Sequence, residues 1–479
     1  MFPRLACRAS IVSALFTLAL TPTVAAAPRT NLLLITADDM NADSPGYMGN
    51  PLGATPNLDK FAAGAVRFER CHVSAPICQP SRSAFMTGRV PHRNGALGFN
   101  PIRRDVPTLV EVLRDNGYFT AAIHKLAHMA PREKFPWDLA LEGSQKDPAG
   151  FGKHVAHCLA AAKEKGKPFF INANAGDPHR PFPGSNQRNA RGERAGAKPD
   201  KVYTADQIKV PSLLEDVPDV RKEVAQYYTG VARFDHCFAE TLAALEHAGH
   251  ADDTLIVFLS DHGMSFPFSK ATVYFNGTWS PVLISPPSLT GGKIKPLVDR
   301  THFVSSVDIL PTVLELLGLP PLAGVDGRSW VPLIRGESQP DRDFVVTHVN
   351  TVSSGKNFAQ RCVRTATHSY LWMAWPDGTA KFRVEAMSGL TFNAMNAAGK
   401  TDERIAARVK QLVVGEREQF FDLRVDPDER KNLVREAEQS AELARLRKLL
   451  LEHMRRTADP QLEAYTKTLA EAGVAVSGR

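Results

Sequence analysis

Short apolar runs alternate with helix-like patterns through the first two-thirds of the chain, and this alternation restricts the possible folds more than any other feature. The strand-like runs are Asn31–Thr36, Phe119–Ile123, Pro168–Ala173 and Leu255–Leu259. Apolar residues three or four positions apart predict helices between these runs, one over 106–115 and a longer one from Val224 to Leu245 that ends near Gly249. Strands that alternate with helices form a mostly parallel sheet with helices on both faces. We therefore expect an α/β fold over most of the chain.

The pattern changes after Pro332. Short apolar runs such as Tyr370–Trp375, followed by the turn residues 376–378 (Pro-Asp-Gly), predict an antiparallel hairpin, and four leucines predict a late helix: Leu443, Leu446, Leu449 and Leu450. We therefore expect a large α/β domain over residues 28–340 and a smaller α+β unit with an antiparallel sheet over residues 341–479. Residues 185–201 are polar and lack periodicity, which predicts a surface loop.

Residues 1–27 have the pattern of a signal peptide. Arg4 and Arg8 supply the positive region, Ile11–Leu20 the apolar run, and Ala25–Ala27 a small-residue cleavage zone. A membrane anchor is the other interpretation, but an apolar run this short cannot cross the roughly 30 Å bilayer core. We expect export to a periplasmic, extracellular or lumenal compartment, and no membrane span.

The charge of the chain says little about its partners. Without residues 1–27, which carry two arginines and no acid, the chain has 56 basic and 51 acidic residues, a net charge of about +5. A mild positive balance fits a polyanionic ligand, but it also fits an ordinary solvated surface. No basic helix with interleaved aromatic residues indicates a nucleic-acid site.

The cysteines are few and odd in number. Cys7 lies in the predicted signal peptide, which leaves Cys71, Cys78, Cys158, Cys237 and Cys362. Five scattered cysteines do not make a disulfide scaffold, and no pair has the spacing of a structural zinc site. At least one thiol is therefore free for another role.

Acidic residues follow two of the predicted strands directly. Asp38 and Asp39 come after the first strand, and Asp261 with His262 after the run that ends at Leu259. Functional residues collect at the carboxyl ends of strands in open α/β sheets. Adjacent carboxylates repel each other in a crevice unless a cation lies between them, and oxygen ligands favour calcium or magnesium. The alternative is that Asp38 and Asp39 only cap the next helix.

The strongest signal is the run from Cys78 to Arg89. Residues 78–82 read Cys-Gln-Pro-Ser-Arg, and residues 86–89 read Met-Thr-Gly-Arg. An isolated cysteine is usually a small buried apolar residue. This run, however, resembles in full the modification signature of the type I sulfatases of the alkaline phosphatase superfamily, and the resemblance extends from Asn31 to about Leu433. It implies that a formylglycine-generating enzyme oxidises Cys78 to formylglycine.

The chemistry explains why such a residue is useful. The hydrate of formylglycine carries two hydroxyls on one carbon, so that one can attack sulfur and expel the sugar. The other then expels sulfate as the aldehyde forms again, whereas a serine would be left as a stable sulfate ester.

The resemblance also implies one calcium ion, and its ligands would be Asp38, Asp39, Cys78, Asp261 and His262. Many family members have Asn where this chain has His262. Arg82 falls on the family's arginine that binds the formylglycine oxygen and offsets the charge of the sulfo group. An isolated arginine would more often be a solvated surface cation.

Two further segments supply the sulfate-binding residues that the resemblance implies. Lys125 matches the family's sulfate-binding lysine, and His128 its histidine, although one extra residue lies between them. His179 matches a histidine that contacts sulfate and protonates the leaving group, which suits a side chain with a pKa near 6.5.

Three more residues complete the predicted site. Lys270 matches the second sulfate-binding cation, and a solvated loop lysine is the alternative. Asp177 and Arg180, on either side of His179, are expected to contact the sugar.

Several local runs are similar to one branch of the family, the heparan N-sulfatase group. They are residues 177–180, 226–231 with Asp235, 260–263 with Phe266 and Pro267, and Tyr274 with Gly277 and Thr278. In this branch Arg364 is expected to reach a substrate carboxylate or hydroxyl. Lys270 replaces the branch's Arg and His262 its Asn, and Arg and Lys differ at bidentate sites. The sequence therefore predicts that the substrate is a glycosaminoglycan-like sulfated carbohydrate. It leaves open whether the sulfo group is N-linked or O-linked.

Two other functions remain open at this point. The same superfamily contains phosphomonoester and phosphonate hydrolases, but its phosphatases use Ser or Thr and hold a second metal. A non-catalytic glycan-binding protein would be expected to lose Cys78 or its acidic cluster first, and both are present. The number of subunits is not predicted.

Overall fold

The computed structural model describes residues 30–188, 192, 196–284, 296–438 and 440–474. The predicted signal peptide lies outside the described residues, as does part of the predicted surface loop at 185–201. Among the described residues, no helix combines the length and the apolar character that crossing a bilayer requires.

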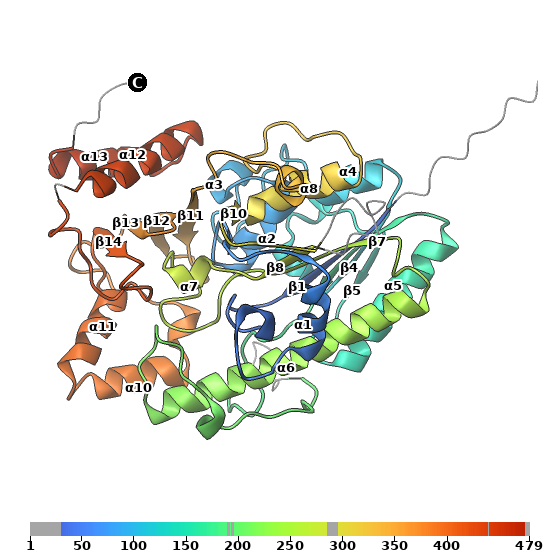
Figure 1. Ribbon diagram of the computed structural model, residues 1–479, viewed down its shortest axis with the longest axis horizontal. Coiled ribbons are helices and arrows are strands. Elements are labelled where there is room, and N and C mark those ends of the chain that lie inside the picture. Colours follow the sequence, from blue (N-terminus) through green and yellow to red (C-terminus); the bar gives the residue numbers. More distant parts are fainter. Residues whose placement is uncertain (1–29, 189–191, 193–195, 285–295, 439, 475–479) are drawn as a thin grey trace, which may run out of the picture.

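An eight-stranded, mostly parallel sheet forms the centre of the molecule (Figure 1). In spatial order its strands are β5 (Leu139–Leu141), β4 (Phe119–Ile123), β6 (Phe169–Asn174), β1 (Asn31–Ala37), β7 (Thr254–Ser260), β8 (Val282–Ile284), β2 (Val66–Phe68) and β9 (Leu297–Asp299). β1 is parallel to both β6 and β7, and only β8 runs against its neighbours. Every residue of β1 and β7 is buried, which explains why both strands are continuous apolar runs.

Helices cover both faces of this sheet. α1 (Pro56–Ala63), α5 (Pro148–Glu164) and α6 (Pro218–His247) share one core with Leu33 and Ile35 of β1. α2 (Cys78–Thr87), α4 (Leu109–Asp115) and α8 (Ile309–Leu316) share the other with Leu32 and Leu34. The predicted fold class is confirmed.

The predicted helix boundaries differ slightly from those observed. α4 begins at Leu109 rather than near residue 106, because Thr108 forms a capping box with Glu111. α6 is longer than predicted: Pro218 occupies its first turn, and the helix ends two residues before Gly249, which has a positive φ of 78°.

The C-terminal part holds a four-stranded antiparallel sheet. Its strands are β11 (Phe344–Thr351), β12 (Asn357–Thr365), β13 (His368–Met373) and β14 (Glu418–Asp422), and α12 (Ala441–Arg456) and α13 (Leu462–Glu471) pack on it. The predicted leucine-rich helix is α12. The predicted domain division at residue 340 falls shortly before β11 and stays a prediction.

The predicted hairpin turn at 376–378 is wrong. The tight turn lies between β12 and β13 at residues 366–367. β13 also pairs with β14, although α10 (Leu390–Ala398) and α11 (Glu403–Val413) lie between these two strands in the sequence. Asp377 accepts the backbone N–H groups of Thr379 and Ala380, so the Pro-Asp-Gly sequence makes a local turn without starting a strand.

Candidate active site

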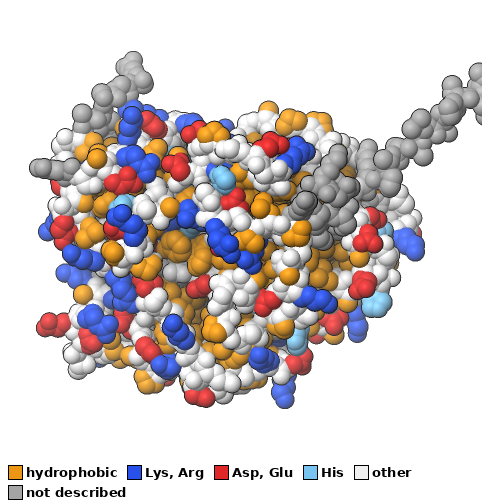
Figure 2. All heavy atoms as spheres, viewed as in Figure 1, with side chains coloured by type: hydrophobic (Ala, Val, Ile, Leu, Met, Phe, Trp, Pro, Cys, Tyr) orange, Lys and Arg blue, Asp and Glu red, His pale blue; other side chains and the backbone are white. Residues whose placement is uncertain are grey.

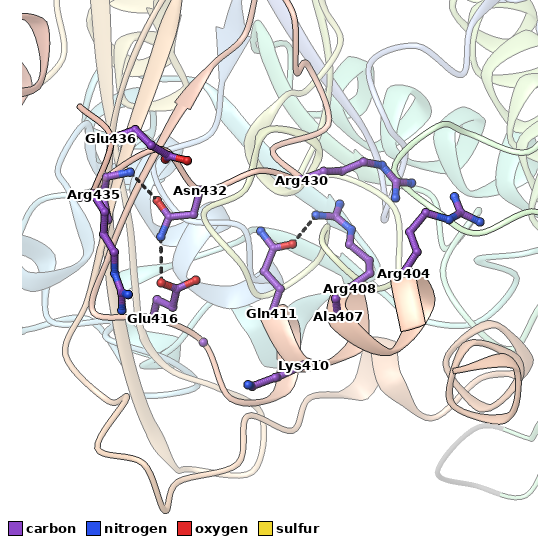
Figure 3. Close-up of a pocket in the computed structure, with 12 residues that line it drawn as sticks. Arg404, Ala407, Arg408, Lys410, Gln411, Glu416, Arg430, Asn432, Arg435 and Glu436 are labelled. Atoms are coloured by element: carbon purple, nitrogen blue, oxygen red, sulfur yellow. Dashed lines mark hydrogen bonds between the residues drawn. The ribbon is translucent and has the colours of Figure 1, made fainter. Parts of the chain in front are cut away.

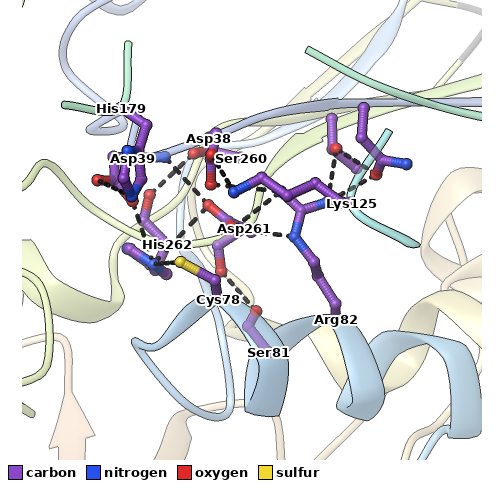
Figure 4. Close-up of polar contacts among 12 residues, drawn as sticks. Asp38, Asp39, Cys78, Ser81, Arg82, Lys125, His179, Ser260, Asp261 and His262 are labelled. Atoms are coloured by element: carbon purple, nitrogen blue, oxygen red, sulfur yellow. Dashed lines mark hydrogen bonds and ion pairs between the residues drawn. The ribbon is translucent and has the colours of Figure 1, made fainter. Parts of the chain in front are cut away.

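Acidic, histidine and cysteine side chains from several elements meet at the carboxyl edge of the main sheet (Figure 4). Asp38 and Asp39 follow β1, Asp261 and His262 follow β7, and Cys78 begins α2. All ten residues of α2 are buried. Its first turn is fixed to the strand end, because the Ser81 hydroxyl donates to the Asp261 carbonyl at 2.5 Å.

The predicted metal ligands lie close together. The potential ligand atoms of Asp39, Cys78 and His262 all lie within 4.8 Å of one another, as do those of Asp38, Cys78 and Asp261. The Nε2 atom of His262 is 3.3 Å from the Cys78 sulfur and 3.3 Å from Asp39 Oδ1. Asp39 Oδ1 is buried without a hydrogen-bond partner. Three buried carboxylates with such an orphaned oxygen fit a hard cation such as calcium.

The environment of Cys78 disfavours a reactive thiolate. The side chain is 3% exposed. Burial raises the pKa of the thiol well above its usual value, and the carboxylates of Asp261 and Asp38 raise it further. Burial therefore favours the protonated form of the thiol in this position.

Arg82 connects three strand ends. Its guanidinium donates to Asp261 Oδ2 through Nε at 3.1 Å and Nη2 at 2.9 Å. Its Nη1 donates to Thr36 and Asn174, at the ends of β1 and β6. The sequence did not point to Asn174, and only the side-by-side arrangement of the strands reveals its role. Arg82 therefore holds the acidic cluster in place.

Lys125 and His128 follow β4 on a short 3₁₀ turn. Lys125 pairs with Asp38, which places its ammonium beside the acidic cluster. Although burial by itself would raise the pKa of Asp38, Lys125, His179 and Arg82 hold it well below the usual value. Burial, together with the cations Lys125 and Arg82, lowers the pKa of His128 to about 2, so its imidazole is neutral.

Lys270 and His179 approach the cluster from the other side. Lys270 Nζ is 2.9 Å from Asp39 Oδ2, and His179 Nε2 is 3.9 Å from the same oxygen. Both also face Glu385, a residue that the sequence did not single out. Its Oε2 is 3.1 Å from Lys270 Nζ, and its Oε1 is 3.5 Å from His179 Nε2. Glu385 lies in a 3₁₀ turn (Glu385–Met387) of the C-terminal part, and no recognisable pattern surrounds it.

Asp177 and Arg180, which are predicted to contact the sugar, are both paired with protein side chains. The carboxylate of Asp177 is fully buried and accepts from Arg233 at 2.6 and 2.9 Å. Arg180 pairs with Glu223 and is 7% exposed. Both side chains are committed to protein partners, and together they fix the segment that carries His179.

Arg364 is also held by protein partners, and its predicted contact with a substrate stays a prediction. Its side chain has no exposed surface, pairs with Glu429 at 2.7 Å and lies 4.9 Å from the ring centre of Phe275. It stabilises the junction between the C-terminal sheet and the loop after β7.

A separate pocket of about 940 Å³ lies between α11 and the segment after β14 (Figure 3). Several cations line it, but Arg430 and Arg404 both pair with Glu215, and Arg408 donates to backbone carbonyls. The chemistry-bearing residues of the strand ends do not line this pocket. On the face shown in Figure 2, Lys and Arg side chains are interspersed with Asp and Glu.

Comparisons with known proteins identify the family of this chain. A family model described as Sulfatase matches residues 30–319, more than half of the chain. The chain is 30% identical over 345 residues to the N-sulphoglucosamine sulphohydrolase of Homo sapiens, which covers 65% of this chain and 67% of that protein.

Two solved structures show the same fold. One is a protein in complex with its substrate D-glucosamine-2-N,6-O-disulfate, with a TM-score of 0.66 and 18% identity over 90% of this chain and 99% of that one. The other is a phosphonate monoester hydrolase from Silicibacter pomeroyi, with a TM-score of 0.65 and 19% identity over 91% and 97%. At these identities the likeness concerns the fold alone.

Proposed function

Because this chain belongs to the sulfatase family and is a sulfuric ester hydrolase, we propose that it removes the sulfo group from a glycosaminoglycan-like carbohydrate, using a formylglycine at position 78 and one calcium ion. The observation that carries the proposal is the convergence of an acidic cluster and separate cations on one residue. Carboxylate oxygens of Asp39 and of Asp261 lie within 4.8 Å of the Cys78 sulfur, and Lys125 and Lys270 each pair with one carboxylate of the cluster.

Calcium fits the acidic cluster. The ion would be held by Asp38, Asp39, Asp261 and His262, and it would neutralise the carboxylates and attract the oxygens of the sulfo group. The orphaned Oδ1 of Asp39 supports this assignment.

The protein's own side chains would bind the sulfo group and supply the proton. Lys125 and Lys270 each contact a carboxylate of the cluster, and they would bind the sulfo oxygens. The Nδ1 atom of His179 faces the Arg180 carbonyl, an acceptor, and must therefore carry a hydrogen. This bond orients the ring so that a proton on Nε2 would reach the leaving atom.

Maturation and export belong to the same proposal. A formylglycine-generating enzyme would act on Cys78 before the chain folds, because the residue is buried in the folded protein. Residues 1–27 would direct the chain out of the cytoplasm.

Two measurements test the proposal together. Peptide mass spectrometry around residue 78 should show a loss of about 18 Da relative to cysteine, as expected when the thiol becomes an aldehyde. The mature protein should hydrolyse an aryl sulfate faster than the matching aryl phosphate. Faster phosphate turnover would favour the phosphonate hydrolases of the same fold, and an inert protein with formylglycine present would favour a glycan-binding role.

A further inference from the structure

The position of Glu385 indicates which kind of sulfur bond, S–N or S–O, the site favours in its substrate. This inference rests on the proposed function. The residue belongs to the C-terminal part, yet its carboxylate contacts both Lys270 and His179. Its backbone is fixed, because its neighbours Val384, Ala386 and Met387 are all buried. The position of this carboxylate is therefore built into the fold.

The exposed fractions of the side chains show how deep each group lies. Asp39 is fully buried and Cys78 is 3% exposed, which places them at the floor of the site. The Lys270 side chain is 5% exposed, that of His179 24%, and that of Glu385 36%. A sulfo group bound at the floor has its sugar toward the solvent. The atom that joins sulfur to the sugar would then lie near His179, whose Nε2 is 3.5 Å from Glu385 Oε1.

Glu385 does not merely neutralise Lys270, which already has a partner. Asp39 lies 2.9 Å from the Lys270 ammonium, closer than Glu385 at 3.1 Å. Lys270 itself lowers the pKa of Glu385, and His179 adds to this effect, so the side chain is an anion. A second anion beside a site for an anionic group is unfavourable unless the ligand offers it a hydrogen-bond donor.

The bridging atom of the substrate decides whether such a donor is present. The nitrogen of a sulfamate carries a hydrogen, whereas the bridging oxygen of a sulfate ester has only lone pairs. We propose that Glu385 selects N-sulfo over O-sulfo sugars by accepting a hydrogen bond from the sulfamate N–H. An ester would place an oxygen against the carboxylate, which costs binding free energy.

The first test measures binding without catalysis. Full-length Cys78→Ala protein, which cannot form formylglycine, is titrated calorimetrically in calcium buffer with glucosamine N-sulfate and with glucose 2-O-sulfate. These two ligands differ only in the bridging NH or O. Glu385→Gln in the same background should weaken binding of the N-sulfate about ten-fold, since the charged acceptor of the hydrogen bond becomes a neutral amide oxygen. Binding of the O-sulfate should stay the same or improve.

The control is Glu142→Gln. Glu142 lies 3.5 Å from His124 and accepts from the backbone N–H of Leu126, so this variant removes the same charge at a different place. It should leave the ratio of the two affinities unchanged. Equal changes for both ligands in Glu385→Gln, or tighter binding of both, would overturn the proposal, because the carboxylate would then only repel or displace anions.

Turnover by the mature enzyme separates this inference from the proposed function. Wild-type protein should have a higher kcat/KM for the N-sulfate than for the O-sulfate, and Glu385→Gln should reduce that ratio while aryl sulfate turnover persists. If the ratio does not change, the role of Glu385 is refuted and the sulfatase activity stands. If no sulfo substrate reacts, the proposed function fails, and the calorimetric comparison still decides the role of Glu385.

Discussion

At the scale of single residues, the site depends on a few buried charges that compensate one another. Arg82 illustrates this, because its planar guanidinium donates to Asp261, Thr36 and Asn174 at once. The signature predicted a functional arginine at position 82, but the partners of this arginine lie at the ends of three strands that are distant in sequence. A lysine would keep the charge and lose most of these bonds.

Arg82→Lys should therefore destabilise the protein by about 1–3 kcal/mol, the cost of leaving buried acceptors of charged hydrogen bonds unpaired. Urea unfolding of both proteins measures this difference. Arg114→Lys, at a half-exposed arginine on α4, is the matched control and should change little. Equal urea midpoints for Arg82→Lys and wild type would contradict the structural role of the Arg82 guanidinium.

The acidic cluster should make stability depend on calcium. Asp38, Asp39 and Asp261 are all buried, and their mutual repulsion is relieved when a cation binds. Removing calcium from about 100 times its Kd should lower the free energy of unfolding by about 3 kcal/mol. Thermal unfolding with and without chelator measures this shift, and Asp39→Asn should reduce it. A Tm that chelator leaves unchanged would argue against the ion.

At the scale of elements, the segment 177–181 is positioned by its neighbours and has little regular structure of its own. Arg233 of α6 holds Asp177, and Glu223 of the same helix holds Arg180. Glu223 also accepts from the backbone of Thr391 at the start of α10. One helix thus connects the His179 segment to the C-terminal part.

Glu223→Gln should misplace His179 and reduce kcat/KM for an aryl sulfate by about 100-fold, the effect of a displacement of about 1 Å. Glu240→Gln, on an exposed face of the same helix, is the control and should behave as wild type. If Glu223→Gln keeps full activity while His179→Ala is inactive, the segment holds its position without this ion pair.

At the scale of the whole molecule, a buried histidine cluster joins the C-terminal part to the large α/β part. His348 of β11 hydrogen-bonds the Ser74 carbonyl at 3.2 Å and His453 at 3.0 Å, and His92 lies 3.8 Å from Asp459. Burial lowers the pKa of His92 to about 4 and of His453 to about 3. The charged groups that act on these rings are Asp326, Asp459, Arg93, Arg361 and Arg456.

The sign of the pH effect follows from these shifts. The folded protein keeps the rings neutral, whereas the unfolded chain takes up protons as the pH falls below about 6.5. Stability should therefore be complete above pH 7 and decline between about pH 6.5 and 4, by about 3 kcal/mol for His92 alone. Denaturant unfolding at several pH values measures the decline. His92→Gln should make it shallower, and an unchanged slope in this variant would exclude His92 as its source.

Much of the fold was predictable because it follows from local pattern. Continuous apolar runs marked β1, β6 and β7, and the spacing of apolar residues marked α6 and α12. The pairing of β13 with β14 was not predictable. Two helices separate these strands in the sequence, and the strands come together only in the folded sheet.

The sequence by itself determined the elements of the main sheet, the family signature around Cys78 and the acidic residues at the strand ends, since each is encoded by neighbouring residues. Tertiary structure alone decided which charges face one another. It paired Asp177 with Arg233 and brought Glu385 against Lys270 and His179. The physical reason is that an ion pair depends on distance in space, and the energy of a buried charge depends on partners that no local pattern identifies.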